Sequence, residues 1–103
     1  MTRSPILRDS LTAWSPRGDG WARTAYHGVR VELSDGASPG AAGSSMEDTL
    51  TAYLFGTCGL RVGDYVAPGN VASDEPPEGA RRVTRISPWS LSGRDHHYEV
   101  GAR

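Results

Sequence analysis

The stretch RRVTRISPWSLSGRDHHYEVG, residues 81–101, decides the fold of this chain of 103 residues. Its first part, Arg81 to Trp89, has the composition of a β-strand, and Pro88 is expected to end that strand. Residues 90–95 are typical of a turn, and residues 96–101 return as an antiparallel partner. The stretch therefore predicts a β-hairpin at the end of the chain.

This hairpin is expected to turn its apolar side chains toward a core. Val83 and Ile86 should face inward, and their odd spacing requires a β-bulge. On the returning strand, either Tyr98 and Val100 or the residues at 97 and 99 face the core. We choose Tyr98 and Val100.

Two earlier segments read as strands around a turn. Residues 10–15 place Leu11 inward, with Trp14 as a second candidate for the core, and residues 16–20 have turn composition. Trp21 to Leu33 reads as one long strand or two short ones, in which the side chains at 29, 31 and 33 share one face. Gly28 lies inside this run, where it indicates a bulge or a sharp bend.

The middle of the chain adds further short strands. Residues 49–57 are apolar and aromatic and predict a strand, with a short helix over Glu47–Leu54 as the alternative. Residues 60–66 form a turn into another strand, and residues 67–80 are a polar excursion. Five or six strands without βαβ spacing predict a mostly β fold, a small antiparallel β-barrel. The length allows a single domain over 1–103, with a loosely held N-terminal arm over 1–9.

One long flexible loop is expected between two strands, over residues 34–48. Its sequence, SDGASPGAAGSSMED, consists mostly of residues with small side chains and shows no periodicity. Loops of this length in small domains are often functional or disordered. A merely disordered surface excursion is the alternative to an arm or gate. The candidate residues of this loop are Ser34, Asp35, Gly36, Gly40, Gly43, Ser44, Ser45, Met46, Glu47 and Asp48.

Charge is distributed in three blocks along the chain. Residues 31–80 hold eight acids and one base, Arg61, whereas residues 1–30 and 81–103 each carry a net charge of +3. The formal net charge of −1 hides this basic–acidic–basic pattern. Opposed blocks of charge suit contacts with an acidic or basic neighbour more than binding of nucleic acid along the whole surface.

Motifs for catalysis or metal binding are weak. His96 and His97 are adjacent, so on a strand they point to opposite faces and are poorly placed to share a metal ion. Cys58 is the only cysteine and has no surrounding signature of a nucleophile, so a packed thiol is expected. Arg17-Gly18-Asp19 is ordinary turn chemistry. The three tryptophans favour core packing or subunit contact over stacking on single-stranded bases.

Composition points to a soluble protein inside a cell or in a particle assembled there. All eleven basic residues are arginine, which a GC-rich genome explains. The N-terminus has no apolar core of a secretion signal, and no apolar stretch has the length of a membrane span.

The order of these segments resembles the small head-completion proteins of long-tailed phages, also called head–tail connector, stopper or minor capsid proteins. The matching pieces are the long strand ending in GVRVE, the flexible insertion, the apolar strand, LRVGDYV, and the closing hairpin with HHYEV. The resemblance covers roughly residues 10–101. The acidic segment DEPPE is longer than the family pattern leads us to expect.

This resemblance implies a structural virion protein of the phage neck, with no catalysis and no cofactor. It implies a homo-oligomer, a dodecameric ring, between a portal-side adaptor and tail-side neck proteins, in which the 34–48 loop points toward double-stranded DNA and helps close its channel. Alternatives are another neck ring (adaptor or tail terminator), or a small β-barrel module that binds nucleic acid or protein. Opposed charges on successive subunit edges would come from Arg81, Arg82, Arg85, Asp64, Asp74 and Glu75.

Overall fold

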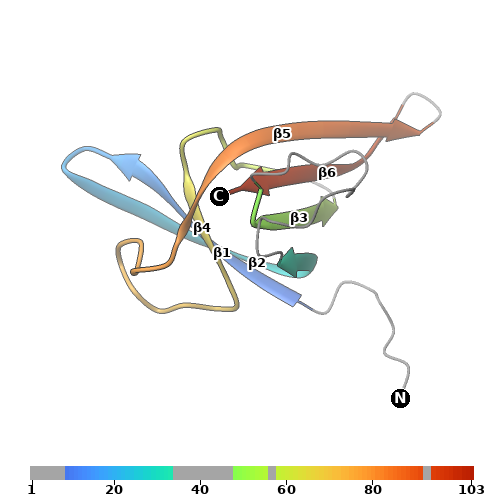
Figure 1. Cartoon of the computed structure of the whole chain (residues 1–103). Helices are drawn as coiled ribbons and strands as arrows, with labels where there is room; N and C mark the ends of the chain where they lie inside the picture. Colours follow the sequence, from blue (N-terminus) through green and yellow to red (C-terminus); the bar gives the residue numbers. More distant parts are fainter. Residues whose placement is uncertain (1–8, 34–47, 56–57, 92–93) are drawn as a thin grey trace, which may run out of the picture.

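Six antiparallel β-strands close into a small barrel (Figure 1). The structure is a computed structural model that describes residues 9–33, 48–55, 58–91 and 94–103. Around the barrel the strands follow the order β1-β2-β3-β6-β5-β4. Their bounds are β1 Asp9–Arg17, β2 Gly20–Leu33, β3 Leu50–Phe55, β4 Tyr65–Pro68, β5 Arg81–Leu91 and β6 Arg94–Ala102. The predicted antiparallel barrel is confirmed, and the alternative of a helix over residues 47–54 is wrong for the described part, which forms β3.

The first two strands form a long hairpin that projects from the barrel (Figure 1). Its turn is tighter than residues 16–20, because Arg17 already pairs with Gly20. The predicted bulge at Gly28 is confirmed: Asp9 pairs with Val29 while the next residue of β1 pairs with His27, so Gly28 is the extra residue. Its φ of 68° is in the left-handed region, which glycine adopts without strain. The bulge bends β2 from one side of the barrel to the other.

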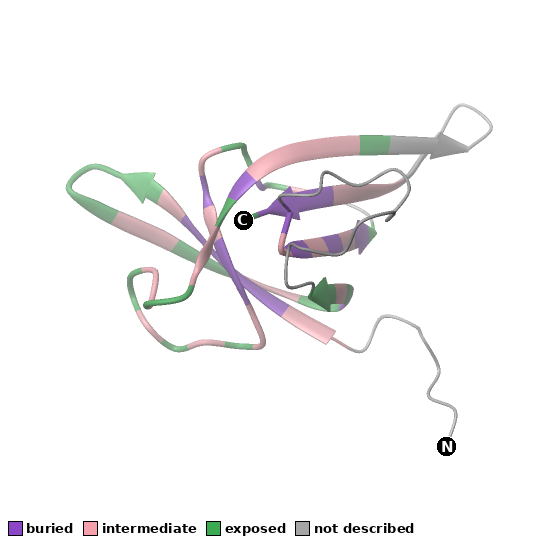
Figure 2. Ribbon diagram, viewed as in Figure 1, coloured by how far each residue is buried: buried purple, intermediate pink, exposed green. Residues whose placement is uncertain are grey.

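The core is built from apolar side chains of all six strands and of the turn that precedes β4 (Figure 2). The predicted inward facing of Val83 and Val100 is confirmed, and the expected bulge in β5 lies between Val83 and Arg85. Ile86 and Tyr26 are only partly buried and pack against this cluster. The core consists of Leu11, Ala13, Val29, Leu50, Ala52, Leu54, Leu60, Val66, Val83, Val100 and Ala102.

Two predictions about the strands are wrong. Leu33 is 58% exposed, because β1 covers β2 only as far as Val29, so the last residues of β2 extend past the core. Pro88 does not end β5, which continues to Leu91. Since β4 and the residues just before it pair only with Arg81 to Val83, the rest of β5 has β6 on one side and no other strand of the described residues on the other. Proline is tolerated on such an edge.

Residues 69–80, which we call the strap, connect β4 to β5 and are fastened to the outer side of β1. The buried Thr12 hydroxyl donates to Gly69 O at 2.7 Å and accepts from Val71 N at 2.9 Å. Trp14 Nε1 donates to Ser73 O at 2.9 Å. The strap therefore covers the face of β1 opposite the core, which explains why both Leu11 and Trp14 are fully buried.

Candidate functional site at the base of the 34–48 segment

The segment between β2 and β3 leaves and returns at one place on the sheet. Leu33, the last residue of β2, is paired with Leu50, the first residue of β3. Of the predicted loop residues, those at 34–47 lie outside the described part of the chain, and only Asp48 can be placed. The structure therefore describes the two attachment points of this segment.

Asp48, the last residue of the predicted loop, is held on the outer face of the sheet. Its side chain is only 3% exposed, and its Oδ2 atom lies 3.2 Å from Arg85 Nη2. The Thr84 hydroxyl donates to Asp48 Oδ1 at 3.4 Å. A carboxylate buried to this degree needs such partners, because an isolated buried charge is strongly unfavourable.

Arg85 joins Asp48 to a second carboxylate. The same Nη2 atom lies 3.2 Å from Glu99 Oε2, and the Arg85 and Glu99 side chains are 29% and 15% exposed. Arg85 Nε is buried and has no hydrogen-bond partner among the described residues. The guanidinium of Arg85, a predicted subunit contact, is thus engaged by two carboxylates of its own chain. Two acids on one base leave this cluster with a net charge of −1.

Gly101 provides the space for this ion-pair cluster. A Cβ atom at this position would lie 2.5 Å from Asp48 Oδ2 and 2.9 Å from Arg85 Nη2. The sequence analysis assigned no role to Gly101. A glycine inside a strand indicates close approach of another group, so the signal was present in the sequence.

Arg81 forms a hydrogen bond with Thr49, the residue that follows Asp48. Its Nε atom donates to Thr49 Oγ1 at 2.7 Å, while Thr49 N donates to Ala102 O at 2.8 Å. Arg81, a predicted subunit contact, makes this contact within its own chain. We call the four residues Asp48, Thr49, Arg81 and Arg85 the β5 clamp. The clamp fixes the point where the 34–48 segment joins β3.

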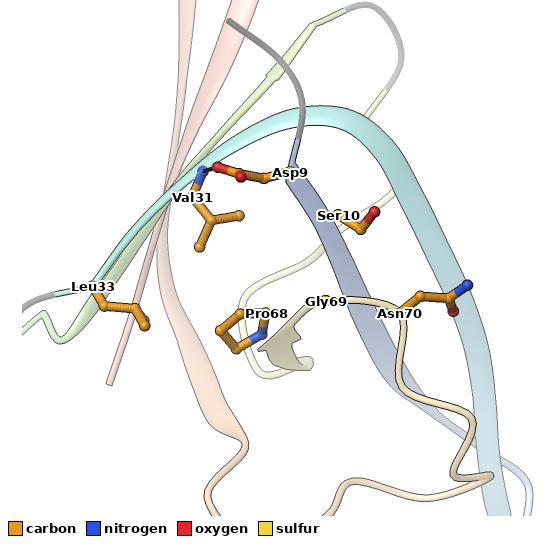
Figure 3. Close-up of a pocket in the computed structure, with 7 residues that line it drawn as sticks. All are labelled: Asp9, Ser10, Val31, Leu33, Pro68, Gly69 and Asn70. Atoms are coloured by element: carbon orange, nitrogen blue, oxygen red, sulfur yellow. Dashed lines mark hydrogen bonds between the residues drawn. The ribbon is translucent and has the colours of Figure 1, made fainter. Parts of the chain in front are cut away.

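The other attachment point lies beside a hollow of about 360 Å³ (Figure 3). Val31 N donates to Asp9 Oδ2 at 2.9 Å, which ties β2 to the start of β1 beyond the bulge. Asp9 thus belongs to β1 and not to the N-terminal arm, whose other residues lie outside the described part. Leu33 and Pro68 give the hollow an apolar wall, as the close-up shows.

Aromatic and charged side chains share the outer face of β2, β3 and β6. The rings of Phe55 and His97 are stacked with centroids 5.4 Å apart, and Phe55 is 43% exposed. The Arg30 guanidinium lies 5.7 Å from the centre of the Tyr53 ring and pairs with Glu32 at 2.6 Å. Burial, and then the nearby charge of Glu32, raise the pKa of Tyr53, so its phenol stays protonated at neutral pH.

The remaining predicted contact residues fall into two groups. Asp64 is buried in the turn before β4, where its Oδ2 accepts a hydrogen bond from Arg61 N at 3.0 Å. Arg82, Asp74 and Glu75 are exposed, as a contact residue must be before assembly.

The side chains considered above for metal binding, nucleophilic catalysis or base stacking are placed as follows. Among the described residues, no three His, Cys, Asp or Glu side chains are arranged to hold a metal ion. Cys58 is a free, half-buried thiol that packs against the core, in line with its expected packing role. Burial and the neighbouring Cys58 raise the pKa of Tyr26. The side chains of Trp89 and His96 lie outside the described part.

No protein-family model, curated protein or solved structure matches this chain. None of the segments that the structure describes forms a helix able to cross a membrane.

Proposed function

We propose that this chain is a structural protein of a phage neck. Copies of it form a ring between the portal-side adaptor and the tail, and the 34–48 segments of these copies help to close the DNA channel after packaging. The proposal rests on the resemblance of the sequence to head-completion proteins and is supported by the geometry of the barrel.

The observation that carries the proposal is the anchoring of the 34–48 segment. Its two ends meet at the paired residues Leu33 and Leu50, and the β5 clamp holds the returning end through a buried ion pair. A segment that blocks a channel under load from DNA needs such a rigid base. Asp35 and Glu47 within the segment repel phosphates, which favours passage of DNA without adhesion.

The test is deletion of residues 36–45 in the phage that encodes the chain. This deletion removes no described residue, so the purified variant should melt with the same cooperativity as the wild type. Filled heads carrying the variant should lose DNA, measured as DNase-resistant DNA per particle. A matched control replaces the ten residues by glycine and serine, which preserves the reach of the segment and changes its sequence. Heads that remain full and infectious after the deletion contradict the proposal.

A further inference from the structure

A basic hollow lies between the β1–β2 hairpin and the turn that precedes β4. Its volume is about 710 Å³, and Arg17, Arg61 and Arg82 are among the residues that line it. It collects one arginine from each of the three charge blocks of the sequence, including the only base of the acidic middle. All three residues are exposed. The one acid of its lining, Asp64, is buried and bonded to the backbone of Arg61.

These three guanidinium groups have no hydrogen bond or ion pair within the described residues, in contrast to Arg23, Arg30, Arg81 and Arg85. Three unpaired positive charges around one hollow create a strong local potential for an anionic group. The hollow is therefore ready to receive an acidic partner.

The strap presents the matching negative charge. Asp74, Glu75 and Glu78 are exposed along it. Their backbone is held in place, because Trp14 binds Ser73 O and the Ser73 hydroxyl donates to Glu75 O at 2.6 Å. Pro76 and Pro77 further restrict the backbone. An acidic segment that is already ordered loses little conformational entropy when it binds.

The hollow and the strap occupy different positions along the hairpin. Ser15, Pro16 and Arg17, near the turn of the hairpin, line the hollow, whereas Thr12 and Trp14, farther from that turn, hold the strap. Figure 1 shows the strap and the turn before β4 on either side of the hairpin. One chain has both charged surfaces, and among the described residues no strap acid forms an ion pair with an arginine of the hollow.

We propose that the basic hollow of one copy binds the acidic strap of the next copy. The partner is a second copy of this chain, and the contact is head-to-tail, as the proposed ring requires. Repetition of such a contact produces a ring when the rotation closes and an open filament when it does not. This inference rests on the proposed ring function, which it extends by naming the surfaces that meet.

A charge-exchange experiment tests the contact. One variant carries Arg17→Glu, Arg61→Glu and Arg82→Glu, and the other carries Asp74→Arg, Glu75→Arg and Glu78→Arg. Self-association is measured by sedimentation velocity and native mass spectrometry at low ionic strength, where exposed charges are least screened. Each variant alone should associate at least about tenfold more weakly than the wild type, because like charges then face each other. The equimolar mixture should associate again, with the two chains alternating.

A matched control exchanges two charges on the other part of β2. Arg30→Glu with Glu32→Arg keeps the net charge and should leave association unchanged. If a triple variant does not fold, Arg61→Glu and Glu75→Arg serve as single reversals, since both side chains are exposed and form no ion pair with the part of the chain that the structure describes.

Three results would overturn the contact. The first is absence of wild-type association up to about 1 mM, the limit of a meaningful affinity. The second is association that neither variant weakens. The third is binding of a short DNA duplex that the arginine variant loses while its self-association is retained, which would assign the hollow to phosphates. Each of these leaves the deletion test of residues 36–45 unaffected, so the contact and the neck function can fail separately.

Discussion

Replacing Arg85 by methionine should be among the most damaging single changes in this barrel. Methionine keeps much of the length of the side chain and removes its charge. Asp48 and Glu99 then face each other without a base, in positions where their side chains are 3% and 15% exposed. Removing one partner of a buried ion pair typically costs about 3–5 kcal/mol. Because Glu99 retains some contact with water, we expect about 3–4 kcal/mol.

This loss is large for a chain of 103 residues, whose total stability is expected at about 5–15 kcal/mol. Each kcal/mol shifts the Tm of a domain of this size by roughly 4–8 °C, so the Tm should fall by about 12–32 °C. The assay is thermal and urea unfolding followed by circular dichroism. Adding Asp48→Asn to Arg85→Met should recover a part of the loss, since only one buried carboxylate then remains.

Asp48→Asn alone is the matched control. It leaves the Arg85–Glu99 pair intact and weakens one charge-assisted hydrogen bond, so about 1–2 kcal/mol is expected. A loss below about 1 kcal/mol for Arg85→Met, together with additive effects of the two substitutions, would refute the assignment of Asp48 to the clamp.

Other substitutions test the remaining structural assignments. Gly101→Ala should destabilise the barrel by about 1–3 kcal/mol in urea unfolding, because the added Cβ meets Asp48. Gly20→Ala, where nothing lies within 4 Å, should be nearly neutral, and equal effects of the two substitutions would contradict the close approach of Asp48 to Gly101. Thr12→Val leaves Gly69 O and Val71 N without their partner and should lower the free energy of unfolding by about 2–4 kcal/mol. The exposed Thr24→Val should change it little, and a neutral Thr12→Val would mean that Thr12 does not hold the strap. Because burial raises the pKa of Tyr26 above its value in the unfolded chain, the free energy of unfolding should fall as the pH rises past about 10. Tyr26→Phe should reduce that fall, measured by urea unfolding at alkaline pH; an unchanged dependence of stability on pH would contradict the burial effect.

The strands were predictable because they follow local rules. The alternation around Val83 and Val100, the bulge at Gly28 and the turn before β4 are all visible as composition and spacing. Leu33 and Pro88 were misjudged because the outcome depends on where a neighbouring strand ends, and pairing between distant strands is not encoded within either strand.

The charged residues were the least predictable part. Arg81, Arg82 and Arg85 look equivalent in the sequence, yet Arg82 is exposed whereas Arg81 and Arg85 are half-buried, because their side chains are held by Thr49 and Asp48. Asp64 similarly looks like a surface acid in the sequence, but its carboxylate accepts a hydrogen bond from Arg61 N within the turn. Counting charges along a chain gives its net charge, whereas the fold decides which of the charged side chains remain exposed and unpaired.

The pairing of Leu33 with Leu50 has a consequence for how this protein can change in length. The cost of closing a connection between two fixed points rises only with the logarithm of its length, by about 0.6 kcal/mol for each doubling. Since β2 and β3 bring the two points side by side, residues can be inserted there with little strain on the barrel. The same position is therefore where a peptide tag or a small guest domain should be tolerated and displayed.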